Sequence, residues 1–142
     1  MRLAERVPES RSPCHGRKEF VMAVILIVED DVFIREIAEM MIQDCGHRML
    51  SASDVDEALS HLRSPQHIDA LFTDIYLKTA VLGGCDLAPQ AIKLRRKLRV
   101  LYTTGNSITD KMKALFVKGS HFLCKPYTQD QLKNSVENLL AA

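Results

Sequence analysis

Apolar runs alternate with amphipathic segments along most of the chain. The runs are short and rich in Val, Ile and Leu, which is typical of strands that are buried on both faces of a parallel sheet. The predicted strands are residues 24–28, 48–52, 68–74, 99–103 and 121–124. Apolar residues spaced three and four apart predict helices at residues 31–45, 54–64, 85–97 and 107–118, and a last helix after Thr128.

Three local signals support these boundaries. Gly46 stands where the first helix would end in a left-handed residue. Asp54 precedes Glu57 by three residues, which is typical of a capping box, and Thr128 is a favoured N-cap. Because strands and helices alternate, we expect a doubly wound α/β fold, with a five-stranded parallel sheet covered by five helices and joined by right-handed crossovers.

The first part of the chain lacks this patterning. Residues 1–21 are polar and charged and contain Pro8 and Pro13, so we predict a disordered N-terminal arm. A single domain then occupies residues 22–142. We expect no second domain.

Composition narrows the range of functions. The chain has 142 residues, of which 46% are hydrophobic and 26% charged, with a formal net charge of +1. This balance is typical of one soluble globular domain and argues against direct DNA binding. No apolar stretch approaches the roughly 20 residues that span a bilayer, and charged residues interrupt the region where a secretory signal would be apolar. We therefore expect a cytoplasmic protein without membrane contact.

The four cysteines form no C-x-x-C pair, which argues against a zinc site or a disulfide framework.

Polar residues stand at the ends of four predicted strands. Asp74 ends the third, Glu29 and Asp30 follow the first, Thr104 follows the fourth and Lys125 follows the fifth. Because the carboxyl ends of parallel strands meet at one edge of the sheet, these side chains should lie together.

Carboxylates placed so close would repel one another, and Mg²⁺, which prefers oxygen ligands, would neutralise them. The simpler interpretation is that the acidic residues after the first strand only cap the first helix. Capping, however, requires neither Thr104 nor Lys125.

In combination these motifs resemble the receiver domain of bacterial two-component response regulators, which has a flavodoxin-like fold. The similarity extends over about residues 22–141. It rests on Ile-Leu-Ile-Val-Glu-Asp-Asp, Phe-Thr-Asp-Ile, Tyr-Thr-Thr-Gly and Phe-Leu-Cys-Lys-Pro, in this order.

The resemblance implies a phospho-acceptor chemistry. Asp74 would take a phosphoryl group from a histidine of a sensor histidine kinase or a histidine phosphotransferase. Asp30 and Asp74 would bind Mg²⁺ directly, Glu29 through water, and Tyr76 through its backbone carbonyl. Lys125 would contact the phosphoryl oxygens. The domain would catalyse only its own phosphorylation and dephosphorylation, so we do not expect an enzyme in the usual sense.

The resemblance also implies a switch. Thr104 would turn toward the phosphoryl group and Phe122 would fill the vacated space, although Phe122 is equally well explained as a core aromatic. The change would reach a surface formed by the fourth helix, the fifth strand and the fifth helix, which would bind a downstream target protein or a second copy. The resemblance further implies a cis bond between Lys125 and Pro126.

The loop after the acceptor departs from the family pattern Asp-x-x-x-Pro-x-x-Asp-Gly. Lys78 replaces the proline and Gly84 comes two residues late, so the loop is longer. Tyr76 would lie over the site and slow hydrolysis of the aspartyl phosphate, or it packs only on the loop. Asn106 would flank the opposite side.

We expect a stand-alone receiver that signals through protein contacts. One alternative is an adaptor that keeps the fold without phosphorylation, but intact acidic, hydroxyl and lysine positions argue against it. The other is a haloacid-dehalogenase-like phosphatase. That enzyme class needs a second aspartate two residues after the nucleophile, where this chain has Tyr76.

Overall fold

The computed structural model describes residues 22–77 and 83–142, so both the predicted N-terminal arm and Lys78 lie outside the described residues. Five parallel strands form one sheet in the order β2-β1-β3-β4-β5. The strands are β1 (Val24–Val28), β2 (Arg48–Ala52), β3 (Ala70–Asp74), β4 (Arg99–Thr104) and β5 (His121–Cys124). The helices are α1 (Val32–Asp44), α2 (Val55–Arg63), α3 (Gly83–Leu94), α4 (Asp110–Lys113) and α5 (Gln129–Ala141).

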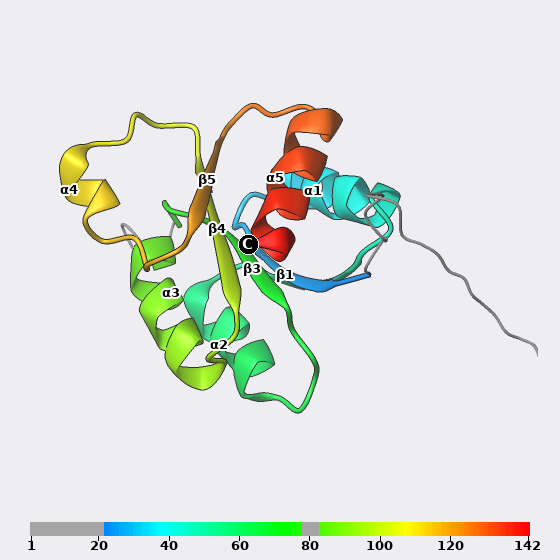
Figure 1. Ribbon diagram of the computed structural model, residues 1–142, viewed down its shortest axis with the longest axis horizontal. Helices are drawn as coiled ribbons and strands as arrows, with labels where there is room; N and C mark the ends of the chain where they lie inside the picture. Colours follow the sequence, from blue (N-terminus) through cyan, green and yellow to red (C-terminus); the bar gives the residue numbers. More distant parts are fainter. Residues whose placement is uncertain (1–21, 78–82) are drawn as a thin grey trace, which may run out of the picture.

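The helices cover both faces of the sheet. Helices α1 and α5 pack together on one face and α2 and α3 on the other, while α4 stands beside the β5 edge (Figure 1). Alternate side chains of each strand enter different layers of the core. In β1, for example, Leu26 joins the cluster under α2 and α3, whereas Ile27 joins the cluster under α1 and α5. The predicted doubly wound fold is therefore confirmed.

The helix ends follow the sequence signals closely. Asp54 accepts a hydrogen bond from Glu57 N, and Thr128 forms a capping box with Gln131. Gly46 has a φ of 90° after the end of α1, a conformation that favours glycine. These predicted boundaries are confirmed.

The predicted helix at residues 107–118 is wrong, because α4 has only four residues, Asp110–Lys113. After α4 the chain continues in turns, and two aromatic contacts explain why. Phe116 stacks on Tyr102 with ring centroids 4.2 Å apart, and Val117 N donates to the buried Tyr102 hydroxyl. These tertiary contacts hold the segment against β4 and outweigh the helical spacing of its apolar residues.

The third helix begins and ends earlier than the predicted residues 85–97, because α3 runs from Gly83 to Leu94. The guanidinium of Arg95, just after α3, donates to the carbonyls of Leu62 and Ser64 at the end of α2. Arg95 therefore joins the end of α3 to the end of α2.

His47 makes the stability of the fold depend on pH. Its Nδ1 accepts a hydrogen bond from Ala23 N, and burial lowers the pKa of His47 below its ordinary value, although the nearby Glu137 and Asp69 carboxylates oppose this. The unfolded chain therefore binds a proton more readily than the folded chain. Stability should fall as the pH drops from about 7 through the unfolded pKa of roughly 6.5.

The His47→Asn variant tests this expectation. An asparagine oxygen can still accept from Ala23 N but does not titrate over this range. Urea unfolding at several pH values should show a shallower loss of stability for the variant than for the wild type. Equal slopes would mean that another group causes the acid sensitivity.

Among the described residues, no helix has the length and apolar character to cross a bilayer.

Candidate functional site

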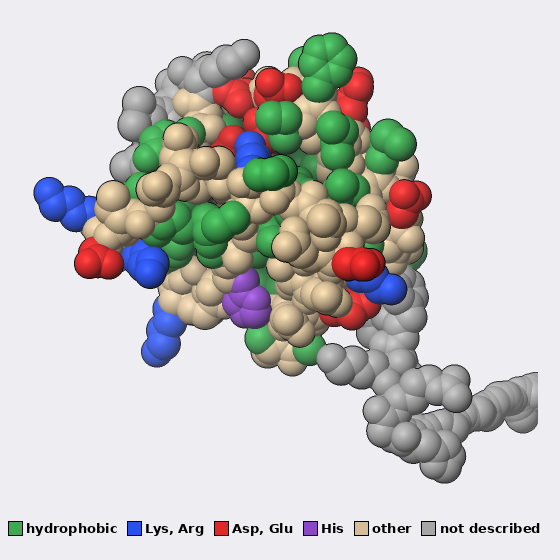
Figure 2. Space-filling view, turned by 90° about the horizontal axis from the view of Figure 1, so that it is seen from above, with side chains coloured by type: hydrophobic (Ala, Val, Ile, Leu, Met, Phe, Trp, Pro, Cys, Tyr) green, Lys and Arg blue, Asp and Glu red, His purple; other side chains and the backbone are tan. Residues whose placement is uncertain are grey.

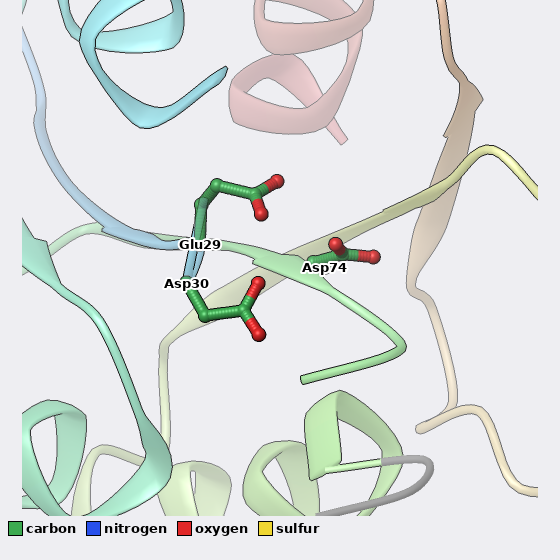
Figure 3. A group of neighbouring side chains, drawn as sticks. All are labelled: Glu29, Asp30 and Asp74. Atoms are coloured by element: carbon green, nitrogen blue, oxygen red, sulfur yellow. The ribbon is translucent and has the colours of Figure 1, made fainter. Parts of the chain in front are cut away.

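Three carboxylates meet at the C-terminal edge of the sheet. Glu29 and Asp30 follow β1, and Asp74 ends β3 (Figure 3). Each offers an oxygen within 4.8 Å of the others. Glu29 and Asp74 are buried, and Asp30 is half-buried. The predicted clustering of these acidic residues is therefore confirmed.

Lys125 brings a positive charge into this cluster from the loop after β5. Its Nζ lies 2.6 Å from Glu29 Oε1 and 2.9 Å from Asp74 Oδ2, and its side chain is only 16% exposed. Burial alone would lower the pKa of Lys125, but hydrogen bonds to both carboxylates more than offset this and raise it. The lysine is therefore held in its charged form.

Glu29 remains under electrostatic strain despite this partner. Burial raises the pKa of Glu29, and hydrogen bonds from Lys125 and from Asp31 N only partly counter the effect. The nearby Asp74 carboxylate raises it further. A second cation at the cluster would therefore further stabilise the ionised form of Glu29, which Lys125 alone stabilises only in part.

Helix capping and the acidic cluster involve different residues. Asp31 is the N-cap of α1, since its Oδ1 accepts from Ile34 N at 3.1 Å. Glu29 and Asp30 instead lie with Asp74. The simpler interpretation, in which the acidic run only caps the helix, therefore holds for Asp31 alone.

Thr104 lies at the end of β4, buried and close to the site. Its Oγ1 accepts a hydrogen bond from Asn106 N, and its carbonyl accepts from Lys125 N. Phe122 is half-buried on β5 and stacks on Phe116 with ring centroids 6.3 Å apart. The ring of Phe122 thus packs against the α4–β5 connection and the core cluster, and the switch role of the two residues stays a prediction.

Tyr76 links Asp74 to α4. Its backbone N–H donates to Asp74 Oδ1 at 3.3 Å, and its hydroxyl lies 3.6 Å from Met112 Sδ. Contact with α4 was not expected from the sequence, which suggested a ring lying over the site or on the loop. The contact holds the ring against α4 and the adjoining core cluster.

Gly84 is a site residue that sequence reasoning treated as part of a loop. It lies in the first turn of α3, and its N–H donates to the carbonyl of Ile75. A Cβ at this position would overlap the carbonyl oxygen of Asp74 and lie 2.9 Å from Ile75 Cα. Only glycine lets α3 approach the end of β3 so closely. The signal was present, since Gly84 follows the acceptor at nearly the family spacing.

An apolar groove of about 450 Å³ runs beside the acidic cluster. It lies between α1 and the segment after β5 and is lined by Ile34, Ile37, Met41, Gly105, Lys125, Pro126 and Tyr127.

The bond between Lys125 and Pro126 is cis, as the resemblance implied. Burial raises the pKa of Tyr127 to about 12, so its hydroxyl stays protonated. Next to the groove, α1 exposes Phe33 and Ile37 by 77% and 51%.

A doubly wound sheet that gathers three carboxylates and a lysine at its C-terminal edge has the architecture of a receiver domain. The chain belongs to the response regulator receiver domain family, which it matches over residues 25–137. Receiver domains act in two-component systems, where they take phosphoryl groups from sensor histidine kinases, and they are generally not classed as enzymes. They bind Mg²⁺ at an acidic pocket, and the oxygen-rich cluster of Glu29, Asp30 and Asp74 suits that ion.

Individual relatives are distant in sequence. The probable transcriptional regulator ycf27 of Porphyridium aerugineum is 23% identical over 116 residues, which cover 82% of this chain and 47% of that protein. The uncharacterized transcriptional regulatory protein YrkP of Bacillus subtilis is 28% identical over 109 residues, covering 76% and 45%. The chain thus spans about half the length of these curated relatives.

Solved receiver structures share the fold. A response regulator receiver protein from Sinorhizobium medicae WSM419 superposes with a TM-score of 0.77 at 26% identity, covering 85% of this chain and 96% of that one. A receiver domain protein from Clostridium thermocellum gives a TM-score of 0.75 at 24% identity, covering 84% and 95%.

Proposed function

We propose that this chain accepts a phosphoryl group on Asp74 and that the receiver domain itself signals through protein contacts rather than by binding DNA. The donor is a phosphohistidine of a sensor histidine kinase or a histidine phosphotransferase. The observation that carries the proposal is the pair of hydrogen bonds from Lys125 to Glu29 and Asp74, beside Asp30. They place a fixed cation next to an acceptor carboxylate at the open edge of the sheet.

The two oxygens of Asp74 are held by different donors. Lys125 donates to Oδ2 and the N–H of Tyr76 donates to Oδ1, so the carboxylate has a defined orientation before a donor arrives. Phosphoryl transfer depends mainly on such positioning and on cations near the phosphoryl oxygens. After transfer, Lys125 is placed to contact an oxygen of the phosphoryl group on Asp74.

Mg²⁺ would neutralise the negative charge of the three carboxylates that Lys125 leaves uncompensated. Asp30, Asp74 and the backbone carbonyl of Tyr76 would hold the ion directly, with Glu29 acting through water. When bound, Mg²⁺ would neutralise the carboxylates and the equatorial phosphoryl oxygens together. The raised pKa of Glu29 is consistent with a site that is built for an additional cation.

The donor protein would approach over α1. The exposed side chains of Phe33, Ile37 and Met40 follow a spacing of four and three residues, which suits packing against another helix. The groove lined by Lys125 continues this apolar surface to the acceptor. A helical protein that docks here could bring its phosphohistidine to Asp74.

Acetyl phosphate with Mg²⁺ tests the acceptor chemistry directly. Intact mass spectrometry should show one added phosphoryl group on the wild type and none on Asp74→Asn. Asp30→Asn should lose the metal-dependent adduct as well, because a ligand carboxylate is missing. Asp31→Asn is the matched control, since Asp31 caps α1 and asparagine is an equally good N-cap.

Two outcomes would contradict the assignment. If Asp74→Asn still gains a phosphoryl group, the acceptor lies elsewhere. If Asp30→Asn is phosphorylated as well as Asp31→Asn, Asp30 is not a metal ligand.

Tyr76 should prolong the life of the aspartyl phosphate. Tyr76 follows Asp74 by two residues, and its hydroxyl is held by the contact with Met112. Hydrolysis needs a water in line with the bond from Asp74 to phosphorus, and a bulky ring at this position would narrow the approach of that water. Tyr76→Asn should therefore lose the phosphoryl group several-fold faster, since a change of roughly 1.4 kcal/mol in the barrier gives a tenfold change in rate. Loss of the adduct can be followed by mass at equal Mg²⁺.

The Tyr76→Phe variant is the control. It keeps the ring but lacks the hydroxyl that contacts Met112. If the ring blocks water, this variant should decay at nearly the wild-type rate. Equal decay of the Asn variant and the wild type would mean that the lifetime is set elsewhere, with Asn106 the next residue to examine.

A further inference from the structure

Arg35 reaches from α1 to the backbone that carries two of the three clustered carboxylates. Its Nη1 donates to the carbonyl oxygen of Glu29 at 2.9 Å. That oxygen belongs to the peptide group between Glu29 and Asp30, just beyond the end of β1. Because a peptide group is planar, holding its orientation also constrains the directions in which both carboxylate side chains leave the backbone. Arg35 therefore acts on the acidic cluster through the main chain.

The guanidinium of Arg35 is itself held in place. Its Nε lies 3.8 Å from Glu39 Oε2, one turn further along α1, and the two side chains are only 20% and 22% exposed. Glu39 Oε2 also accepts a hydrogen bond from the Ser51 hydroxyl on β2. The carbonyl of Ser51 lies 2.9 Å from His61 Nε2 of α2. Contacts that involve α1, β2 and α2 thus orient the side chain that holds the Glu29 carbonyl.

The stability of α1 alone does not explain an arginine at this position. Arg35 is the fourth residue of α1, and a positive charge near the start of a helix opposes the helix dipole. Ion pairs one helical turn apart, such as Arg35 with Glu39, contribute little on their own. The hydrogen bond to Glu29 lies outside the helix and holds the turn that carries the acidic residues.

The charge of Arg35 and its hydrogen bond have opposite effects on a cation at this site. On the face shown in Figure 2, acidic side chains (red) lie close together, with a basic side chain (blue) beside them. Lys125 contributes one positive charge to a cluster of three carboxylates. A further positive charge nearby repels a divalent cation, so its removal should, by charge alone, strengthen Mg²⁺ binding. Weaker binding after loss of Arg35 would therefore report positioning and not charge.

We propose that Arg35 is a positioning residue for the Mg²⁺ site. Its hydrogen bond holds the peptide between Glu29 and Asp30 in the orientation that lets both carboxylates serve the ion, and this role needs no contact with the ion or with the phosphoryl group. Mg²⁺ requires near-ideal octahedral geometry, so a small rotation of this peptide weakens binding. The inference rests on the proposed function, because it concerns the Mg²⁺ site of the same domain.

An Mg²⁺ titration of the full chain, followed by the amide shifts of its NMR spectrum, tests the proposal without phosphorylation. Arg35→Met keeps much of the aliphatic length but has no donor for the Glu29 carbonyl. It should bind Mg²⁺ about tenfold more weakly than the wild type, the size of effect typical of residues that orient metal ligands, although it has lost a positive charge. The amide signals of Glu29 and Asp30 should differ from those of the wild type before Mg²⁺ is added.

Two further variants show whether the hydrogen bond is responsible. Arg35→Lys should recover part of the affinity, because an ammonium can donate to the Glu29 carbonyl but lacks the planar fork that also reaches Glu39. Arg96→Met is the matched control, since Arg96 is exposed just after α3 and its loss should leave Mg²⁺ binding unchanged. Melting curves identify a temperature at which all variants are folded, and the titrations are run there.

Glu39 provides an independent test of the same contacts. Glu39→Gln keeps an oxygen for the Ser51 hydroxyl but removes the charge that holds the guanidinium. It should weaken Mg²⁺ binding by a smaller factor than Arg35→Met. In the Arg35→Met background the same change should have no further effect, because Glu39 acts on the site only through Arg35. A loss that persists in the double variant would contradict this, since Glu39 would then act through its own charge.

Labelling by acetyl phosphate separates the effect on the metal from the effect on the reaction. In Arg35→Met, the Mg²⁺ concentration that gives half-maximal labelling of Asp74 should rise about tenfold, whereas the rate at saturating Mg²⁺ should stay close to that of the wild type. The NMR titration does not depend on this reaction. The expected pattern of Mg²⁺ affinities without labelling of Asp74 would therefore refute the proposed function and still support the role of Arg35.

The proposal fails if Arg35→Met binds Mg²⁺ as tightly as the wild type or more tightly, because only the effect of charge would then remain. It also fails if Arg35→Lys is no better than Arg35→Met, if Arg96→Met loses as much affinity, or if the wild type shows no shifts with Mg²⁺. A rate at saturating Mg²⁺ that falls as far as the affinity would point to a general disturbance of the fold and would overturn it as well.

Discussion

Replacing Gly84 by alanine should cost the protein both stability and phosphorylation. The new Cβ would overlap the carbonyl oxygen of Asp74 and crowd Ile75 Cα, and both are backbone atoms that cannot turn away as a side chain can. Either α3 moves outward or the end of β3 shifts. Overpacking of this kind costs about 1–3 kcal/mol, and contact with backbone places it at the upper end. The melting temperature should fall by roughly 10 °C.

The same displacement should impair the acceptor. A shift of Asp74 would disturb its hydrogen bonds with Lys125 and Tyr76, so labelling by acetyl phosphate should slow at least about tenfold even in molecules that remain folded. Gly105→Ala is the matched control. Gly105 lies at the site, but its nearest neighbour to a new Cβ would be Lys125 Cβ at an ordinary 3.9 Å. If both variants behave alike, close packing at Gly84 does not position the acceptor.

The strand ends were predictable from the sequence because of how parallel sheets are built. A carboxylate that ends a buried, largely apolar strand must emerge at the C-terminal edge, and Asp74 does so. The capping residues Asp54 and Thr128 were predictable for a similar reason, since their hydrogen bonds reach only three residues along the chain. Strand ends and helix caps of this kind are therefore determined by residues that are close together in the sequence.

Features that depend on distant contacts were not predictable. Helical spacing around Met112 suggested a long fourth helix, yet the stacking of Phe116 on Tyr102 ends it after one turn. The link from Tyr76 to Met112 joins residues 36 positions apart and leaves no periodic signal. The position of Gly84 inside α3 depends on how closely that helix approaches β3. Each of these outcomes is decided by tertiary packing, which a single sequence does not display.

The site itself lies between these two cases. The spacing of the strands brings Glu29, Asp30 and Asp74 to one edge, and their closeness follows from the parallel order β1 next to β3. Lys125 arrives from β5, two strands away from β3. The strand ends predicted that Lys125 would lie near the carboxylates, but its contact with two of them depends on the length and direction of its side chain, which the pattern does not specify.

Replacing Lys125 by methionine should destabilise the metal-free protein strongly. Methionine keeps much of the aliphatic length but leaves Glu29 and Asp74 buried without the cation that now lies within 3 Å of each. Removing one partner of a buried ion pair costs about 3–5 kcal/mol, because the remaining charge is left uncompensated. Urea unfolding in the presence of a chelator should show a loss of this size relative to the wild type. Lys118→Met, at an exposed lysine outside the site, should change stability by less than about 0.5 kcal/mol.

Mg²⁺ should restore much of the stability that Lys125→Met loses. The ion binds the folded carboxylate cluster and not the unfolded chain, so it stabilises by mass action, and the variant has the greater excess of negative charge to neutralise. The gain on adding Mg²⁺ should therefore be larger for the variant than for the wild type. Phosphorylation by acetyl phosphate should nevertheless stay at least about tenfold slower, because no side chain replaces Lys125 beside the phosphoryl oxygens. A loss of stability that is equal with and without Mg²⁺ would contradict the idea that Mg²⁺ and the charge of Lys125 neutralise the same carboxylates.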